Sequence, residues 1–184
     1  MQANTLIKSD LYRYSGKTNL KAFLYHFKNS EGFKFMVFLR LSQSYSKLNP
    51  IGLLSRYFYR RLTYKFGFQI PKSVKIGKGL VLMHTGHIIV NSKSKIGSNC
   101  NIYPGVTIGT TFRGKDKGVP VIGDQVWIGS NSIIVGKITI GNNVLIAPNS
   151  FINKSVPDNS LVLGNPAVIK PRDNATAEYI FNMV

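Results

Sequence analysis

The most regular pattern in the sequence is an apolar position that returns every six residues. In the second half of the chain isoleucine fills six such positions in succession: Ile122, Ile128, Ile134, Ile140, Ile146 and Ile152. A period of six matches neither the 3.6-residue repeat of an amphipathic helix nor the alternation of a flat strand. It matches a β-helix, in which three six-residue segments form one triangular coil of about 18 residues. We therefore predict a mainly β protein whose stacked coils bury a continuous apolar column.

The residues around these isoleucines suit the corners of such a coil. Glycine follows directly at Gly123, Gly129 and Gly141. Further corner candidates are asparagines, which tolerate positive φ as glycine does: Asn99, Asn131, Asn142, Asn143 and Asn149. The single cysteine, Cys100, lies four residues after Ile96 at an inward position. We therefore expect Cys100 to be a core side chain and not an acyl-cysteine nucleophile.

The repeat continues upstream of Ile122 with two interruptions. It slips by two residues between Ile88 and Ile96, and by eight between Ile108 and Ile122. The larger slip contains residues 110–118, TTFRGKDKG, whose glycines and charges are typical of an exposed segment. We expect these residues to form a loop that protrudes from the β-helix.

A different pattern precedes the repeat and predicts helices. Helical periodicity, with Ser-Glu-Gly and Asn-Pro breaks, places three of them at residues 21–27, 33–48 and 51–66. In the third helix one apolar stripe consists of Ile51, Leu54, Phe58 and Leu62. The basic residues of this helix lie largely off that stripe, among tyrosines: Arg56, Arg60, Arg61 and Lys65. They fit either a solvated face of a helical cap or a surface in contact with anionic lipid headgroups.

These patterns divide the chain into three parts. We predict a basic, aromatic-rich helical region over residues 1–68 and a β-helix of five to six coils over residues 69–170. A C-terminal tail follows over residues 171–184, with a short helix expected from Asn174 onward.

Composition narrows the class of protein. The 184 residues include 24 Lys and Arg against seven Asp and Glu, a net charge of +17, of which residues 1–75 hold +12 (14 basic, two acidic). With 43% hydrophobic residues and one cysteine, the chain is neither disordered nor a disulfide scaffold. We find no signal peptide and no apolar stretch of membrane-spanning length, and we predict a cytoplasmic protein. The basic excess suits nucleic acid, an anionic membrane or an acidic polymer, and composition does not choose among them.

Three segments together resemble a known family. They are the six-residue repeat, His84 within GLVLMHTGHIIV, and the closing GNPAVIKP, so the resemblance covers residues 69–172. The chain is similar to the left-handed β-helix acyltransferases, in their serine acetyltransferase branch. The runs FKFMVFLRLSQ and RRLTYKFGFQIP further resemble members of polysaccharide pathways. The resemblance implies a left-handed helix and a homotrimer that binds acetyl-CoA in the clefts between neighbouring subunits.

The resemblance also implies a catalytic base. A hydroxyl attacks a thioester only as its proton is removed, and histidine, with a pKa of about 6.5, suits that task near neutral pH. The family's base falls on His84. A backbone carbonyl or Gln69 could orient its ring.

The family's acetyl-CoA contacts transfer to positions on several coils of this sequence. They are Gly109, Thr110, Ser130, Pro148, Lys154, Lys170 and Arg172. Backbone amides at Gly109 and Thr110 would meet the pantetheine and the developing oxyanion. The cations would meet the nucleotide phosphates, although each also fits a solvated edge charge.

Three positions depart from the serine-specific members. Gln69 stands where they have an aspartate fifteen residues before the histidine, Met83 replaces the aspartate just before it, and Val119 replaces their second active-site histidine. Those groups hold a small charged amino acid, so their loss disfavours L-serine as acceptor. We expect a larger neutral acceptor instead, a sugar hydroxyl of a carbohydrate or glycolipid.

The expected acceptor contacts are Met83, His87, Gln69 and Arg113. A zinc site would need three converging histidines, and the chain offers only His26 besides His84 and His87. We therefore predict no metal.

Three functions remain open at this point. The first is acetyl-CoA-dependent O-acetylation of a sugar in capsule, exopolysaccharide or O-antigen biosynthesis, beside an anionic membrane. The second is acetylation of an amino sugar, an amino acid or an antibiotic. The third is an inactive basic trimer that binds an anionic polymer, and no specific nucleic-acid motif supports it.

Overall fold

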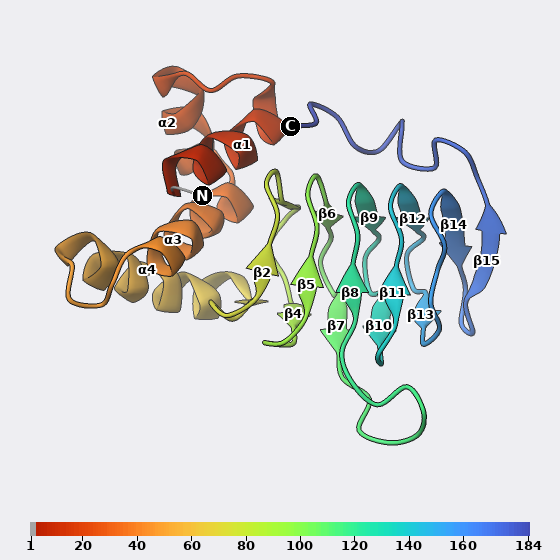
Figure 1. Ribbon diagram of the computed structural model, residues 1–184. Helices are drawn as coiled ribbons and strands as arrows, with labels where there is room; N and C mark the ends of the chain where they lie inside the picture. Colours follow the sequence, from red (N-terminus) through yellow and green to blue (C-terminus); the bar gives the residue numbers. More distant parts are fainter. Residues whose placement is uncertain (1–2) are drawn as a thin grey trace.

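The computed structural model describes residues 3–184 and shows a helical region packed on one end of a β-helix (Figure 1). The helices are α1 (Ala3–Ser15), α2 (Leu20–Asn29), α3 (Glu31–Ser44) and α4 (Pro50–Phe66). Asn49 caps α4 and Gly67, at φ 79°, ends it. The three predicted helices are present. The fourth, α1, was not predicted.

Fifteen short strands follow in the described residues. They are β1 (Phe68–Gln69), β2 (Lys75–Ile76), β3 (Val81–Leu82), β4 (Ile88–Val90), β5 (Lys95–Ile96), β6 (Asn101–Ile102), β7 (Thr107–Gly109), β8 (Val121–Ile122), β9 (Val126–Ile128), β10 (Ile133–Val135), β11 (Thr139–Ile140), β12 (Val144–Ile146), β13 (Phe151–Ile152), β14 (Ser160–Leu163) and β15 (Val168–Pro171).

The strands form three parallel sheets, and each coil gives one strand to each sheet. The first sheet is β1-β4-β7-β10-β13, the second is β2-β5-β8-β11, and the third runs from β3 through β6, β9 and β12 to β14, with β15 added antiparallel. Ile134 pairs with Ile152, eighteen residues on, so three segments of six residues make one coil. The mainly β fold of about five coils is confirmed.

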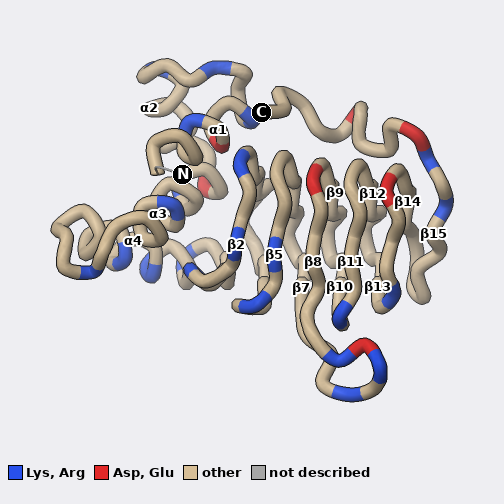
Figure 2. The backbone as a smooth tube through the Cα atoms, in the orientation of Figure 1, with Lys and Arg blue, Asp and Glu red and all other residues tan. Residues whose placement is uncertain are grey.

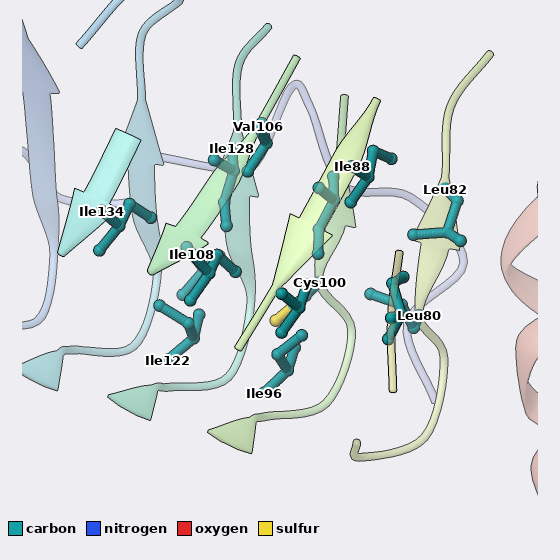
Figure 3. Close-up of a cluster of buried hydrophobic side chains, with 14 of the residues drawn as sticks. Leu80, Leu82, Ile88, Ile96, Cys100, Val106, Ile108, Ile122, Ile128 and Ile134 are labelled. Atoms are coloured by element: carbon teal, nitrogen blue, oxygen red, sulfur yellow. The ribbon is translucent and has the colours of Figure 1, made fainter. Parts of the chain in front are cut away.

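The repeating isoleucines point into the β-helix and make its core (Figure 3). Ile128, Ile134 and Ile140 are fully buried, and Cys100 is buried in the same core, as predicted. Burial raises the pKa of the Cys100 thiol to about 12, which leaves it protonated and unreactive near neutral pH.

The corners use glycine and asparagine differently from our prediction. Asn99, Asn131 and Asn143 do adopt positive φ, but Gly123, Gly129 and Gly141 do not. Glycine is needed at these positions because neighbouring coils stack closely: a Cβ on Gly123 would lie 2.7 Å from the carbonyl oxygen of Gly141. Asn142, predicted at a corner, does not adopt positive φ either.

The smaller slip lies earlier in the chain than the pattern indicated. Leu82 pairs with Ile102, while Val90 pairs with Ile108, so the turn from β3 to β4 is two residues longer than the turn from β6 to β7. The larger slip is a protruding loop as predicted, closed at its base by two hydrogen bonds between Thr111 and Gly118.

A buried ion pair fastens the helical region to the first coil. Arg40 of α3 donates to both carboxylate oxygens of Asp10 in α1, at 2.9 and 3.1 Å, and both side chains are at most 1% exposed. Arg40 also donates to the carbonyls of Ile76 and Gly77, and Asp10 accepts from the amide of Leu80. Burial raises the pKa of the Asp10 carboxyl, and Arg40 opposes that rise.

Only two of the four residues predicted to form the apolar stripe of α4 face the core. Leu62 is buried and Phe58 partly buried, but Ile51 and Leu54 are 49% and 57% exposed. The helix instead buries a face that includes Gly52 and Phe66. Within residues 3–184 no helix is long and apolar enough to cross a membrane.

The tail forms turns and not the expected helix. It runs back along the third sheet to the helical region (Figure 1). Three asparagines of the β-helix hold it: the amide of Thr176 donates to Asn143, the side-chain amide of Asn101 donates to the carbonyl of Tyr179, and the amide of Val184 donates to Asn99. Trp127 packs under this tail with Ile180.

Candidate functional site

His84 lies in the extended turn between β3 and β4. The two additional residues of this turn carry it outward from the first coil. Its backbone has φ 56° and its side chain is exposed, with the ring centre of Tyr103 6.4 Å from its own. An exposed imidazole is free to meet a substrate and to exchange protons with it.

A cavity of about 200 Å³ lies beside His84, between the β-helix and the helical region. Its walls come from α1, from the connection of α2 to α3, and from β3 with the turn that follows it: Tyr14, Asn29, Ser30, Glu31, Gly32, Leu82, Met83 and His84. The hydroxyl of Tyr14 donates to the carbonyl of Leu82 at 3.1 Å and accepts from its amide at 3.2 Å. A Cβ on Gly32 would lie 2.1 Å from that carbonyl, so only glycine allows α3 to begin so close to β3.

Glu31 is the only acidic side chain that lines this cavity. Tyr14 lines the same cavity. Burial raises the pKa of the Tyr14 hydroxyl, and the negative charge of Glu31 adds a smaller contribution to that rise. A carboxylate beside an exposed histidine can hold a cationic group of a substrate near the base.

A larger cavity, of about 550 Å³, lies on the other side of the same turn. Gln69 and His87 line it with Tyr59, Tyr64 and Ile89. The predicted acceptor contacts are therefore divided: Met83 lies beside His84 in the smaller cavity, whereas Gln69 and His87 face the larger one.

The predicted donor residues lie on two edges of the β-helix. Ser130 and Pro148 follow β9 and β12, on the same edge as His84, and their turns stack through a hydrogen bond from the amide of Asn149 to the carbonyl of Ser130. Gly109 ends β7 and Thr110 follows it on the next edge, separated from the first by the width of one sheet.

The remaining donor candidates are basic side chains. Lys154 follows β13 on the edge of Thr110, while Lys170 and Arg172 lie at β15 at the far end of the third sheet. Arg113 is exposed on the protruding loop. Within one chain these residues do not converge on a single cavity.

Of the eight residues that line the smaller cavity, only Met83 and His84 were predicted as site residues. Among the other six, Tyr14 and Glu31 carry titratable groups that the sequence did not assign to the site. Tyr14 belongs to the helix that the pattern did not predict, and Glu31 had been assigned to a break between helices. Among residues 3–184 no group of three or more His, Cys, Asp and Glu side chains is placed to hold a metal ion.

The sequence and the fold of this chain are similar to those of known proteins. Residues 120–154 match the family model of the bacterial transferase hexapeptide (six repeats). The gonococcal serine acetyltransferase structure (Neisseria gonorrhoeae) superposes with a TM-score of 0.75 at 28% identity, over 94% of this chain and 68% of that one. The chain has the hexapeptide-repeat fold of the serine acetyltransferases. The structure of the serine acetyltransferase from Brucella abortus strain S19 superposes equally well, with a TM-score of 0.76 at 27% identity, over 94% of this chain and 70% of that one.

Curated sequence relatives of this chain are also serine acetyltransferases. The serine acetyltransferase of Staphylococcus aureus (strain Mu50) is 34% identical over 140 residues, 76% of this chain and 62% of that protein. That of Staphylococcus epidermidis (strain ATCC 12228) is 38% identical over 128 residues, 70% and 57% of the two chains. The chain thus spans less than two thirds of the length of these curated relatives.

The prediction of a sugar acceptor is wrong on this evidence. The relatives and the solved structures are serine acetyltransferases, so they agree with our amino-acid alternative and not with polysaccharide O-acetylation. The inference failed because it treated the loss of charged groups at Gln69 and Met83 as the loss of all charge. The carboxylate of Glu31, from another element, lines the same cavity as His84.

Proposed function

We propose that the protein is an acetyl-CoA-dependent acetyltransferase whose acceptor is the hydroxyl of a small amino acid, with L-serine as the first candidate. The observation that carries this proposal is the exposed His84 beside Glu31, in a small cavity of a hexapeptide-repeat fold shared with serine acetyltransferases.

The proposed chemistry is a direct transfer. A ring nitrogen of His84 accepts the proton of the acceptor hydroxyl as its oxygen attacks the thioester carbonyl carbon. Backbone amides near Gly109 and Thr110 stabilise the oxyanion that forms. The carbon–sulfur bond then breaks, and the departing CoA thiolate takes the proton from the imidazolium. The products are an O-acetyl ester and CoA, and no acyl-enzyme is needed.

The cavity supports a small cationic acceptor. A volume of about 200 Å³ suits an amino acid and not an oligosaccharide. Glu31 would pair with the ammonium group while the hydroxyl points toward His84. The carboxylate of the acceptor would find donors in the amide of Asn29 and the hydroxyl of Ser30.

A trimer is part of the proposal. The predicted donor residues lie on two edges of one chain, so a single β-helix does not enclose acetyl-CoA. If a neighbouring copy set its Thr110 edge against the His84 edge, Ser130 and Pro148 of one chain would face Gly109 and Thr110 of the other. Exposed Ile89 and Ile133 on the first sheet offer apolar surface for such contact.

The donor is tested by thermal unfolding with and without acetyl-CoA. A ligand at 100 times its dissociation constant stabilises the folded state by about 2.7 kcal/mol, which raises the melting temperature visibly. Lys154→Ala with Lys170→Ala should weaken the shift. A folded trimer whose melting temperature millimolar acetyl-CoA does not change would contradict the donor assignment and favour the inactive binding trimer.

The acceptor is tested by CoA release. We expect thiol release with L-serine and less with L-threonine, whose methyl group crowds the attacking oxygen, and none above background with glucose. Release with neutral sugars and none with hydroxy amino acids would overturn the acceptor assignment. The predicted cytoplasmic location belongs to this proposal, because the donor is a cytoplasmic metabolite.

A further inference from the structure

We propose that the outer face of α4 docks the protein on an anionic lipid surface. We call the α4 face the exposed side chains of this helix that point away from the helical core: Leu53, Leu54, Tyr57, Arg60, Arg61, Tyr64 and Lys65. This surface is separate from the cavity beside His84, so the inference does not depend on the proposed function.

The α4 face is more apolar than the outside of a solvated helix needs to be. Leu53 and Leu54 are 65% and 57% exposed, and Tyr64 is 76% exposed. The opposite side of the helix already supplies the contact with the core through Leu62 and Phe66. Most of the surface of these two leucines is therefore free of contacts within this chain, and together they make an apolar patch of the kind that marks a binding surface.

The patch extends to the tip of the helical region. Leu48, in the turn between α3 and α4, is 88% exposed, and Ile51 in the first turn of α4 is 49% exposed. This turn projects at the end of the molecule opposite to β15 (Figure 1). A projecting turn of this shape can enter a soft surface without moving the β-helix.

The charge around the patch has one sign. Residues 45–66 hold Lys47, Arg56, Arg60, Arg61 and Lys65 and no acidic residue. Figure 2 shows this run of basic positions along α4. Asp10, one of the two acidic residues in the first 75, is buried and already paired with Arg40. A second copy of the chain would bring like charges together, so the complementary partner is anionic.

The arrangement of the two kinds of side chain favours lipid over nucleic acid. Leucine has no partner along a phosphate backbone, whereas at a bilayer it enters the boundary of headgroups and acyl chains. The stems of Arg60 and Lys65 reach outward to headgroup phosphates while the tyrosine rings lie between the two layers. Interleaved leucine, tyrosine and arginine on one exposed face is the pattern of an interfacial helix.

The experiment is co-sedimentation of the full chain with vesicles at physiological salt. The vesicles are phosphatidylcholine alone, and phosphatidylcholine mixed with phosphatidylglycerol. We expect binding to the mixed vesicles only. The triple variant Arg60→Gln/Arg61→Gln/Lys65→Gln should bind roughly 100-fold more weakly, because each basic residue near an anionic surface contributes severalfold to the affinity. Leu53→Ser/Leu54→Ser should also weaken binding, by roughly tenfold or more.

A matched control removes the same charge elsewhere. Lys75, Lys93 and Lys95 are exposed on the β-helix, so Lys75→Gln/Lys93→Gln/Lys95→Gln should bind vesicles nearly as the unchanged protein does. Equal weakening by both triple variants would overturn the proposal, since net charge alone would then explain binding. So would unchanged binding of the leucine variant, or tighter binding of a DNA duplex than of vesicles. Association of trimers that the leucine variant abolishes, without vesicle binding, would assign the face to a second copy instead.

Discussion

His84 adopts a backbone conformation that its side chain does not favour. At the matching edge of later coils, positive φ occurs at Gly105, Asn131 and Asn149, residues that accept it at little cost. A histidine with φ 56° stores strain of about 1–3 kcal/mol. Strain of this kind is retained where the side chain serves a function, and the cavity beside His84 supplies a place for that function.

Because of this strain, one substitution can separate the chemical role of His84 from its effect on stability. His84→Asn removes the base but keeps a residue that tolerates positive φ. We expect kcat to fall about 10²- to 10⁴-fold, the usual contribution of a general base, while the melting temperature stays equal or rises. Steady-state kinetics and thermal unfolding on the same preparation check this. A variant that keeps most of its turnover would remove His84 from the mechanism.

Glu31 should determine affinity for the acceptor and not the rate of chemistry. Glu31→Gln keeps the size of the side chain and removes the charge that would hold an ammonium group. We expect the KM for L-serine to rise by about 10-fold or more, as the loss of a charge-assisted hydrogen bond implies, with the KM for acetyl-CoA unchanged. Lys28→Gln on neighbouring α2, at a more exposed side chain outside the cavity, is the control; equal effects of both variants would refute a specific role of Glu31.

The sequence predicted single residues well where the six-residue periodicity identified them. Cys100 follows from its place in the six-residue repeat, and it is buried. Tyr14 and Glu31 could not be predicted, because each reaches the cavity through tertiary packing of the helical region. No spacing in the sequence brings residues 14 and 31 to residue 84.

At the scale of elements, the repeat predicted the sheets because every coil repeats one local environment. Helix α1 escaped prediction because its buried side has few large apolar residues, chiefly Ile7 and Leu11. Its remaining contacts are polar and buried, through Asp10 and Arg13. Such contacts stabilise a helix in its tertiary setting and leave little trace in a hydrophobic pattern.

The Asp10–Arg40 pair should therefore dominate the attachment of α1. Asp10→Asn leaves the guanidinium buried and only partly paired, and we expect unfolding free energy to fall by about 3–5 kcal/mol. Denaturant unfolding measures the change. The double variant Asp10→Asn/Arg40→Met, which removes both charges, should lose less than the single variant. If Asp10→Asn unfolds like the unchanged protein, the pair contributes little to attachment.

For the whole molecule, the tail connects the two ends of the structure. It leaves β15 at the last coil, covers Trp127 and Leu145 with Ala175 and Ile180, and reaches the first coils at Val184. Sequence composition favoured a helix here, with Ala175, Ala177 and Glu178 in a row of helix formers. Asparagines of the β-helix overrode that preference, because the side chains of Asn99, Asn101 and Asn143 bond the tail backbone.

The tail can be followed through Trp127, the only tryptophan of the chain. Its ring centre lies 4.7 Å from Tyr103 and 5.1 Å from Tyr179, and the residue is only 9% exposed. Deleting residues 174–184 should expose the indole, shift its emission to the red, and lower unfolding free energy by at least about 2 kcal/mol from the lost burial of Ile180 alone. The circular dichroism of the β-helix should remain, because its coils pair without the tail.

A point variant separates docking of the tail from its mere presence. Ile180→Asp places a charge in the buried cluster and should reproduce the red shift, whereas Phe181→Asp, at a side chain 62% exposed, should not. Because Tyr179 and Phe181 also line a cavity with Met83 and Tyr103, a released tail opens the surface next to His84. If both variants emit like the unchanged protein, the tail is not held by Ile180, and its path over the third sheet must rest on the asparagine hydrogen bonds alone.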